Sequence, residues 1–158
     1  MTSDTHPLAV VADELPERPK PSLGPFTARL SPRQKCVLGD VFGLTNFGVN
    51  LTRLPPGGIS ALRHAHTRQD ELVYIIEGEA TLVTNTGETR LRAGMCAGFK
   101  AGTGDAHQLV NRGQRDVVFI EVGDRSPGDT VTYPDDDLEA VSGPDGKYQY
   151  RRRDGTPY

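Results

Sequence analysis

The chain has 158 residues, with 18 basic and 21 acidic side chains and a formal charge of −3 at pH 7. This length suits one domain with additional terminal segments, and the balanced charge argues against a nucleic-acid partner or a membrane surface. No apolar run approaches the roughly 20 residues that span a bilayer, and the first residues lack the basic start and apolar core of a secretory signal. Two cysteines are too few for a disulfide framework, so we expect a cytoplasmic protein in which both are small buried side chains, with a catalytic thiol as the alternative.

Residues 1–25 form a proline-rich segment, for which we predict an extended arm. Prolines at positions 16, 19, 21 and 25 favour an extended backbone over a core element. Whether this arm lies across a neighbouring subunit is left open by the sequence.

Residues 26–125 carry the pattern of consecutive short strands. Phe47, Val49 and Leu51 alternate with smaller or polar residues, which is the period of a half-buried strand. Arg53 shares their parity, and we expect this face of the strand to point inward. Runs of β-forming residues separated by turns predict further strands at 71–78, 79–84, 88–92, 93–99, 107–112 and 116–123. Many short strands at this spacing predict a sandwich or barrel of antiparallel strands.

Residues 126–158 are predicted to form a C-terminal extension that packs on the barrel or on a partner subunit. It is expected to contain a loop and then about two helical turns, with Asp135 or Asp136 as the N-cap and Gly143 as the stop. The adjacent aspartates suit a capped helix start better than a cation site. Residues 147–158 leave room for one edge strand.

Two histidines one residue apart give the strongest indication of chemistry. If His64 and His66 lie on a strand, their side chains leave the same face, with Cα atoms roughly 6.6 Å apart. Imidazoles at that separation can converge on one cation. Glu71 shares its parity with Val73 and Ile75, so we expect it to point into an apolar face, where a carboxylate needs a partner or a metal.

A third histidine, His107, opens another predicted strand and shares its face with Leu109 and Asn111. A single histidine is more often a hydrogen-bonded or exposed residue, but three inward histidines with a carboxylate in register predict one metal site. Its predicted ligands are His64, His66, Glu71 and His107. Nitrogen and oxygen ligands suit Fe, Mn, Co, Ni, Cu or Zn without distinguishing among them. Asp105 and Gln108 are sequence candidates for orienting the imidazoles.

The stretch 58–78 resembles the first motif of the cupin superfamily. That motif is Gly, five residues, His-x-His, four residues, Glu, six residues, Gly, and here every spacing fits from Gly58 to Gly78. The second motif is matched by Gly94, Gly102, His107 and Asn111. Two departures occur in it: Lys100 replaces the usual proline, and the loop before His107 carries two extra residues, as in many small bacterial cupins.

This resemblance implies an all-β fold, an antiparallel double-stranded β-helix or jelly-roll barrel, with an extended N-terminal arm and a short C-terminal helix. It also implies a homodimer that pairs through barrel edges and the arm. The wider pattern is similar to a group of small bacterial cupins, some of them labelled as sugar-phosphate isomerases.

Three classes of function follow from a metal site of this kind. The first is an enzyme acting on a small, oxygen-rich metabolite, as an isomerase or a dioxygenase, with the metal as Lewis acid. Candidate substrate-binding residues are Arg53, Lys100 and Tyr74, and Glu79, Tyr74 and Lys100 are candidate general bases. The others are a non-catalytic protein that binds a small molecule through its metal, and a structural or storage protein.

Overall fold

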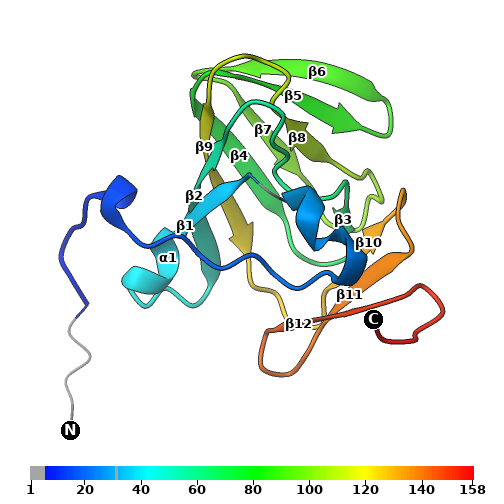
Figure 1. Ribbon diagram of the computed structural model, residues 1–158. Helices are drawn as coiled ribbons and strands as arrows, with labels where there is room; N and C mark the ends of the chain where they lie inside the picture. The colour runs from blue at the N-terminus through cyan, green and yellow to red at the C-terminus, as the bar shows by residue number, and fades with distance from the viewer. Residues whose placement is uncertain (1–5, 31) are drawn as a thin grey trace, which may run out of the picture.

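The computed structural model describes residues 6–30 and 32–158, and their strands form three antiparallel sheets (Figure 1). The largest sheet has five strands in the order β1-β2-β9-β4-β7. Their bounds are Gln34–Val37 for β1, Phe47–Leu54 for β2, Val117–Asp124 for β9, Glu71–Glu77 for β4 and Cys96–Phe99 for β7. A bulge interrupts the β4–β9 pairing between Ile75 and Glu77.

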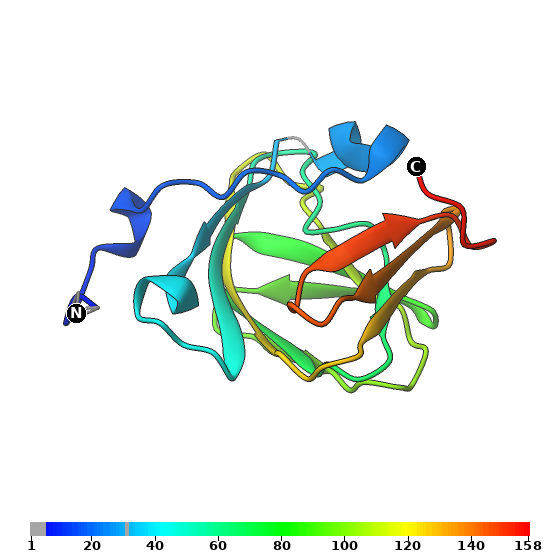
Figure 2. The ribbon, with the colours of Figure 1, turned by 90° about the horizontal axis from the view of Figure 1, so that it is seen from below.

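Two smaller sheets complete the barrel. One has the order β6-β5-β8, with bounds Gly87–Arg92, Glu79–Thr84 and Gln108–Val110. The other has the order β12-β11-β10-β3, with bounds Tyr148–Arg151, Leu138–Ser142, Thr130–Tyr133 and Ala65–His66. Seen from below, the β10–β12 strands face the five-stranded sheet across the interior of the barrel (Figure 2). The predicted double-stranded β-helix is therefore confirmed.

Helical structure is confined to three short segments of the described residues. They are the 3₁₀ helices Ala12–Glu14 and Gly24–Leu30 and the α-helix α1, Leu38–Val41. None of the described helices is long and apolar enough to cross a membrane.

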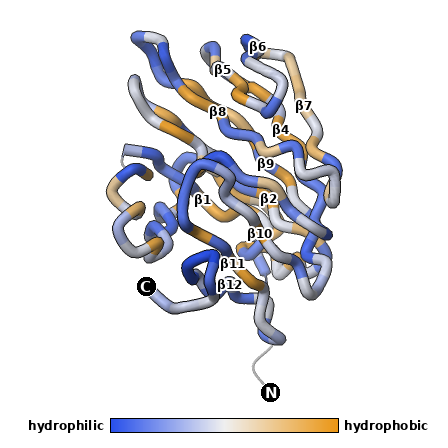
Figure 3. Tube along the Cα trace, turned by 90° about the vertical axis from the view of Figure 1, so that its right-hand side faces the viewer, coloured by the Kyte–Doolittle hydropathy of each residue, from blue (hydrophilic) through white to orange (hydrophobic). Residues whose placement is uncertain are grey.

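Alternation along the strands fills the barrel interior. On β4, Val73 and Ile75 are buried while Leu72 and Tyr74 are exposed, because successive side chains leave opposite faces. Ile75 and Val73 of β4 pack in one core cluster with residues from five other strands: Leu54, Ala80, Leu82, Leu91, Leu109, Val117 and Phe119. Hydrophobic segments accordingly gather along β4, β8 and β9 (Figure 3).

The face of β2 that points inward differs from the prediction. Thr52 and Leu54 are buried, whereas Phe47 is 41% exposed, so the alternating set of Phe47, Val49 and Leu51 lies on the outer face. The prediction was wrong because both faces of this sheet carry apolar residues. Cys96 is also exposed on β7, contrary to the expectation of a buried thiol, because it leaves the outer face of an edge strand.

The C-terminal segment forms strands where a helix was predicted. Residues 134–137 make a turn between β10 and β11, and the aspartates lie in this turn instead of at a helix start. Alternate residues are buried on each strand: Val131 and Tyr133 on β10, and Leu138 and Ala140 on β11. This period of two residues is that of a strand and not of a helix. The predicted edge strand is confirmed as β12.

The N-terminal arm runs along the mouth of the barrel before the chain enters β1 (Figure 2). The backbone N–H of Arg18 donates to the carbonyl of Lys35 at 2.7 Å. Leu23 and Leu30 are buried in a second core cluster with Leu62 and Leu138. Residues of the three predicted segments, 1–25, 26–125 and 126–158, thus share one core, while the boundaries between them remain predictions.

Candidate metal centre

Two backbone pairings bring the three histidines together. The N–H of His64 donates to the carbonyl of His107 at 3.1 Å, and the N–H of His107 returns a bond of 2.8 Å. His66 lies in β3, which pairs with β10. Glu71 opens β4 opposite Gly123, beside which the Cγ of Glu71 packs. Strands from different sheets therefore bring these four side chains to one place.

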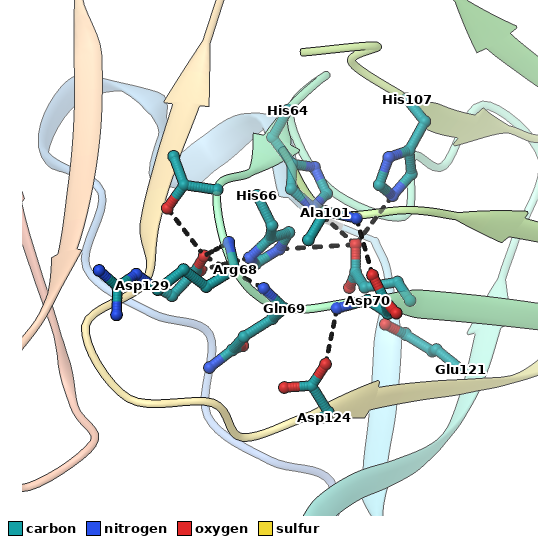
Figure 4. A network of polar contacts seen from close by, with 12 residues as sticks. His64, His66, Arg68, Gln69, Asp70, Ala101, His107, Glu121, Asp124 and Asp129 are labelled. Atoms are coloured by element: carbon teal, nitrogen blue, oxygen red, sulfur yellow. Dashed lines mark hydrogen bonds and ion pairs between the residues drawn. The ribbon is translucent and has the colours of Figure 1, made fainter. Parts of the chain in front are cut away.

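The three imidazoles face one carboxylate oxygen (Figure 4). Oε2 of Glu71 lies 3.4 Å from Nε2 of His64, 3.5 Å from Nε2 of His66 and 2.9 Å from Nε2 of His107. The donor atoms of His64, His66 and Glu71 all lie within 4.8 Å of one another. The structure thus brings together all four residues that the sequence predicted, and their role as ligands remains a prediction.

Hydrogen bonds at Nδ1 orient two of the rings. Nδ1 of His64 donates to the carbonyl of Leu62 at 2.8 Å, and Nδ1 of His66 donates to Oδ2 of Asp129 at 2.6 Å. A ring that donates from Nδ1 keeps its lone pair on Nε2, the nitrogen that faces Glu71. The His107 ring is instead stacked on Phe99, with centroids 3.5 Å apart and planes 1° from parallel, and its Nδ1 has no hydrogen-bond partner among the described residues.

Asp129 is the orienting residue that sequence reasoning missed. It is fully buried, and besides His66 it accepts hydrogen bonds from the backbone of Arg68 at 2.7 Å and the hydroxyl of Tyr148 at 2.8 Å. Burial alone would raise the pKa of Asp129, but the bonds from His66 and Tyr148 outweigh it and hold the pKa below its ordinary value. Asp129 lies 63 residues after His66, and no local pattern connects the two.

The predicted orienting residues have other partners. Asp105 accepts a hydrogen bond from the backbone of Asn85, and the side chain of Gln108 donates to the carbonyl of Ala61. Neither of these bonds is made to an imidazole.

The electrostatics of the cluster are dominated by burial and by Glu71. Burial would raise the pKa of Glu71, but His107 and His64 outweigh it and hold the pKa well below the ordinary range. Burial lowers the pKa of His107 more than Glu71 raises it. At His64 burial also lowers the pKa, but Glu71 prevails and the pKa lies above its ordinary value. Glu71 is thus the carboxylate that faces the Nε2 atoms of all three imidazoles.

The residues present fit a divalent transition-metal ion. Oε2 of Glu71 is buried and lacks a hydrogen bond of good geometry, although three Nε2 atoms face it. A buried anion in that situation is costly unless a cation satisfies it. Three imidazole nitrogens and a carboxylate oxygen form the set that such ions take in proteins.

Of the three predicted substrate-binding residues, Lys100 lies at this site, and Tyr74 and Arg53 do not. Lys100 lines a narrow cleft beside His66, Glu71 and His107, with a volume of about 10 Å³. Tyr74 is 46% exposed on the outer face of β4. Arg53 does not point inward as predicted, because Thr52 and Leu54 occupy the inner face, and its guanidinium pairs with Asp116.

The inner face carries a polar group that the sequence did not indicate. Glu121 of β9 lies opposite Val73, one inward position along from Glu71. Its carboxylate accepts a hydrogen bond from the Thr52 hydroxyl and pairs with Nζ of Lys35 at 2.9 Å. A surface cavity of about 850 Å³ lies near Gly78, at the other end of β4 from Glu71, and none of the four cluster residues lines it.

Comparison with known proteins agrees with this architecture. A family model described as the cupin domain matches residues 50–123. The crystal structure of a sugar phosphate isomerase of the cupin superfamily from Silicibacter pomeroyi superposes with a TM-score of 0.88. It shares 39% sequence identity over 95% of this chain and 96% of that chain.

Two further crystal structures are more distant. A proposed sugar phosphate isomerase from Acidithiobacillus ferrooxidans has a TM-score of 0.71 and 27% identity over 80% of each chain. A predicted oxalate decarboxylase from Thermotoga maritima has a TM-score of 0.59 and 20% identity over 74% of this chain and 98% of that chain, which shows the fold alone. Comparison with the curated proteins finds no significant match. From the match over almost its whole length to the Silicibacter protein, the chain belongs to the cupin superfamily.

Proposed function

We propose that this chain is a metal-dependent enzyme that isomerises a small, oxygen-rich metabolite of the sugar-phosphate class, with His64, His66, Glu71 and His107 as the ligands. The observation that carries the proposal is the convergence of three Nε2 atoms on Oε2 of Glu71. The 39% identity to a protein described as a sugar phosphate isomerase supports the reaction class.

The residues around the centre have separable roles in this proposal. A bound divalent ion supplies a Lewis acid that polarises carbonyl or hydroxyl oxygens of the substrate. Asp129 and the carbonyl of Leu62 hold the His66 and His64 rings in place, and the flat face of Phe99 excludes water from His107. The protein thus keeps its donor atoms positioned before a substrate arrives.

Isomerisation also needs a group that moves a proton between adjacent carbons. The side chains of Tyr74 and Glu79 are exposed, and we assign this role to Glu121 instead. Glu121 faces the interior beside Glu71, and its carboxyl oxygens accept hydrogen bonds from Lys35 and Thr52. Its charge also acts on His64, to which it lies close enough to raise the pKa.

The test is a turnover assay with the metal-loaded protein. Aldose and ketose phosphates are supplied in turn, and interconversion is followed by NMR, with Glu121→Gln and His64→Ala as the variants. We expect turnover by the wild type, loss of metal and activity in His64→Ala, and loss of activity with metal retained in Glu121→Gln. Oxygen consumption by the Fe(II)-loaded protein would contradict the isomerase proposal and indicate a dioxygenase. Thermal stabilisation by a metabolite without turnover would indicate a non-catalytic binding protein.

We also propose a homodimer, formed through the outer face of the five-stranded sheet. Leu72, Tyr74 and Ile76 are between 40% and 46% exposed along β4, and Phe47 is 41% exposed on β2. A row of large apolar side chains on one sheet face is typical of a surface covered by a partner. The unpaired cysteines, Cys36 and Cys96, support the proposed cytoplasmic location.

A further inference from the structure

A second cavity lies between the N-terminal arm, β1 and the β10–β12 sheet. Its volume is about 250 Å³, compared with about 10 Å³ for the cleft at Lys100. It is lined by residues from the arm, from the strands and from the segment before His64: Arg18, Pro19, Pro21, Leu23, Leu30, Arg33, Lys35, Ala61, Leu62, Tyr133, Tyr148 and Tyr150. Three of these side chains are basic and none is acidic.

Arg33 is the unusual member of this lining. Its side chain is buried, with 7% of the residue exposed, although an arginine is almost never fully buried unless paired. One Nη1–H donates to the carbonyl of Ser60, while Nε is buried without a hydrogen-bond partner among the described residues. A buried guanidinium with an unused N–H needs an anion to satisfy it.

The neighbouring charges leave the cavity positive. Lys35 pairs with Glu121 at 2.9 Å, so one of the three cations is balanced by a carboxylate. Burial lowers the pKa of Arg33, and Arg18 lowers it further by repulsion, while Glu121 and Glu17 act in the opposite direction. Glu17 is paired with Lys20 at 3.3 Å, so Arg18, Arg33 and Lys35 against Glu121 leave a net charge of +2, which matches a phosphate monoester dianion.

This cavity lies next to the metal cluster. The ring of Tyr133 is 6.0 Å from that of His64, and the ring of Tyr148 is 6.4 Å from that of His66, measured between centroids. Leu62, which lines the cavity, also accepts the hydrogen bond from Nδ1 of His64. A ligand of a few carbons that reaches past these side chains could place its anionic end here and its other oxygens at the cluster.

We infer that this cavity binds the phosphate group of the substrate, with Arg33 and Arg18 as its recognition residues and the phenol rings of Tyr133 and Tyr150 beside it. The inference rests on the proposed function, because it identifies which substrates of the sugar class fit the site. It also assigns the N-terminal arm a part in substrate binding, since Arg18 and two prolines of the arm form one wall of the cavity.

The test measures the binding of inorganic phosphate by calorimetry and by thermal shift, using full-length His64→Ala protein without metal. Removing the metal excludes phosphate bound to an ion at the cluster, and the arginine variants then test whether the remaining binding occurs in the cavity. We expect the metal-free protein to bind phosphate, Arg33→Gln to weaken binding by roughly tenfold or more, and Arg18→Gln by a few fold. Acetate should bind more weakly than phosphate, because it carries one charge.

Arg90→Gln is the matched control, because Arg90 is highly exposed on β6 and pairs with Glu79 at 3.6 Å. It should leave phosphate binding unchanged. Failure of the metal-free protein to bind phosphate, or equal affinity in the Arg18 variant, would overturn the inference even if Arg33→Gln does not fold. Equal affinity for acetate would overturn the assignment to phosphate.

The two proposals fail separately in these experiments. Phosphate binding without turnover of any sugar phosphate would support the cavity as a phosphate site and contradict the isomerase proposal. If the protein turns over sugar phosphates and Arg18→Gln and Arg33→Gln do not change this activity, the isomerase proposal is supported. The same result contradicts the cavity as the phosphate site.

Discussion

At the scale of single residues, Asp129 has the largest share in ordering the cluster. Its two carboxylate oxygens accept different hydrogen bonds: Oδ2 accepts from His66 and Tyr148, and Oδ1 accepts from the backbone N–H of Arg68. A carboxylate can accept on both sides, whereas an amide presents one oxygen and one NH₂ group. Replacing one oxygen therefore forces a donor against a donor.

Asp129→Asn is expected to lower metal affinity by about 10- to 100-fold, because it disturbs the ring of His66 without removing a ligand. The affinity is measured by competition with a chelator. Asp154→Asn serves as the matched control, since the Asp154 side chain is exposed and bonds only within its own turn. Equal metal affinities in the two variants would show that Asp129 does not position His66.

At the scale of elements, the turn between β4 and β5 depends on a glycine at a crowded position. Gly78 has φ of +78°, and a Cβ placed there would lie 2.4 Å from the carbonyl oxygen of Asp116. Gly146 has nearly the same φ, +75°, but a Cβ there would have nothing within 4 Å. Comparing alanine substitutions at Gly78 and Gly146 therefore distinguishes the cost of backbone strain from the cost of steric contact.

Gly146→Ala is expected to lower the free energy of unfolding by about 1 kcal/mol, from the left-handed backbone alone. Gly78→Ala should cost about 1–3 kcal/mol more, because the neighbouring backbone must move. Both values are measured by urea denaturation. Equal losses in the two variants would mean that the close approach of Asp116 is relieved without cost.

The sequence predicted elements well where one pattern dominated. The His64, His66 and Glu71 positions followed from strand parity and spacing, and the strands β4 to β9 followed from β-forming runs bounded by turns. The inward face of β2 could not be predicted, because Val49 and Leu51 on one side compete with Thr52 and Leu54 on the other. Strand parity sorts the residues into two faces but does not identify which face points into the barrel.

Contacts between residues far apart in the chain also could not be predicted from the sequence. Asp129 and Glu121 are separated from the residues they contact by 63 and 86 positions, and neither lies in a local pattern. The C-terminal aspartates resembled a helix cap, yet the turn they form lets Asp135 pair with Arg63 and Asp136 with Arg29. Tertiary contacts of this kind override local preference.

At the scale of the whole molecule, the outer face of the five-stranded sheet bears on assembly. The register aligns Tyr74 of β4 with Ile120 of β9, and Ile120 with Leu51 of β2, so that apolar side chains run across three strands. In the proposed homodimer, two-fold pairing would set this face against the same face of a second copy.

Tyr74→Glu is expected to convert the proposed homodimer to a monomer, because the charge would be buried without a partner. Size-exclusion chromatography with light scattering measures the mass in solution. Thr89→Glu, on the exposed strand β6 of another sheet, should leave the dimer intact. A monomeric wild type, or a dimeric Tyr74→Glu protein, would contradict the proposed interface.

The metal site is tested most directly by a crystal structure of protein purified without added metal salts, with anomalous scattering to locate and identify the ion. The expected result is one anomalous peak per chain, in contact with the Nε2 atoms of His64, His66 and His107 and with the Glu71 carboxylate. A peak elsewhere, or none in protein soaked with each candidate metal, would contradict the site and the chemistry assigned to it.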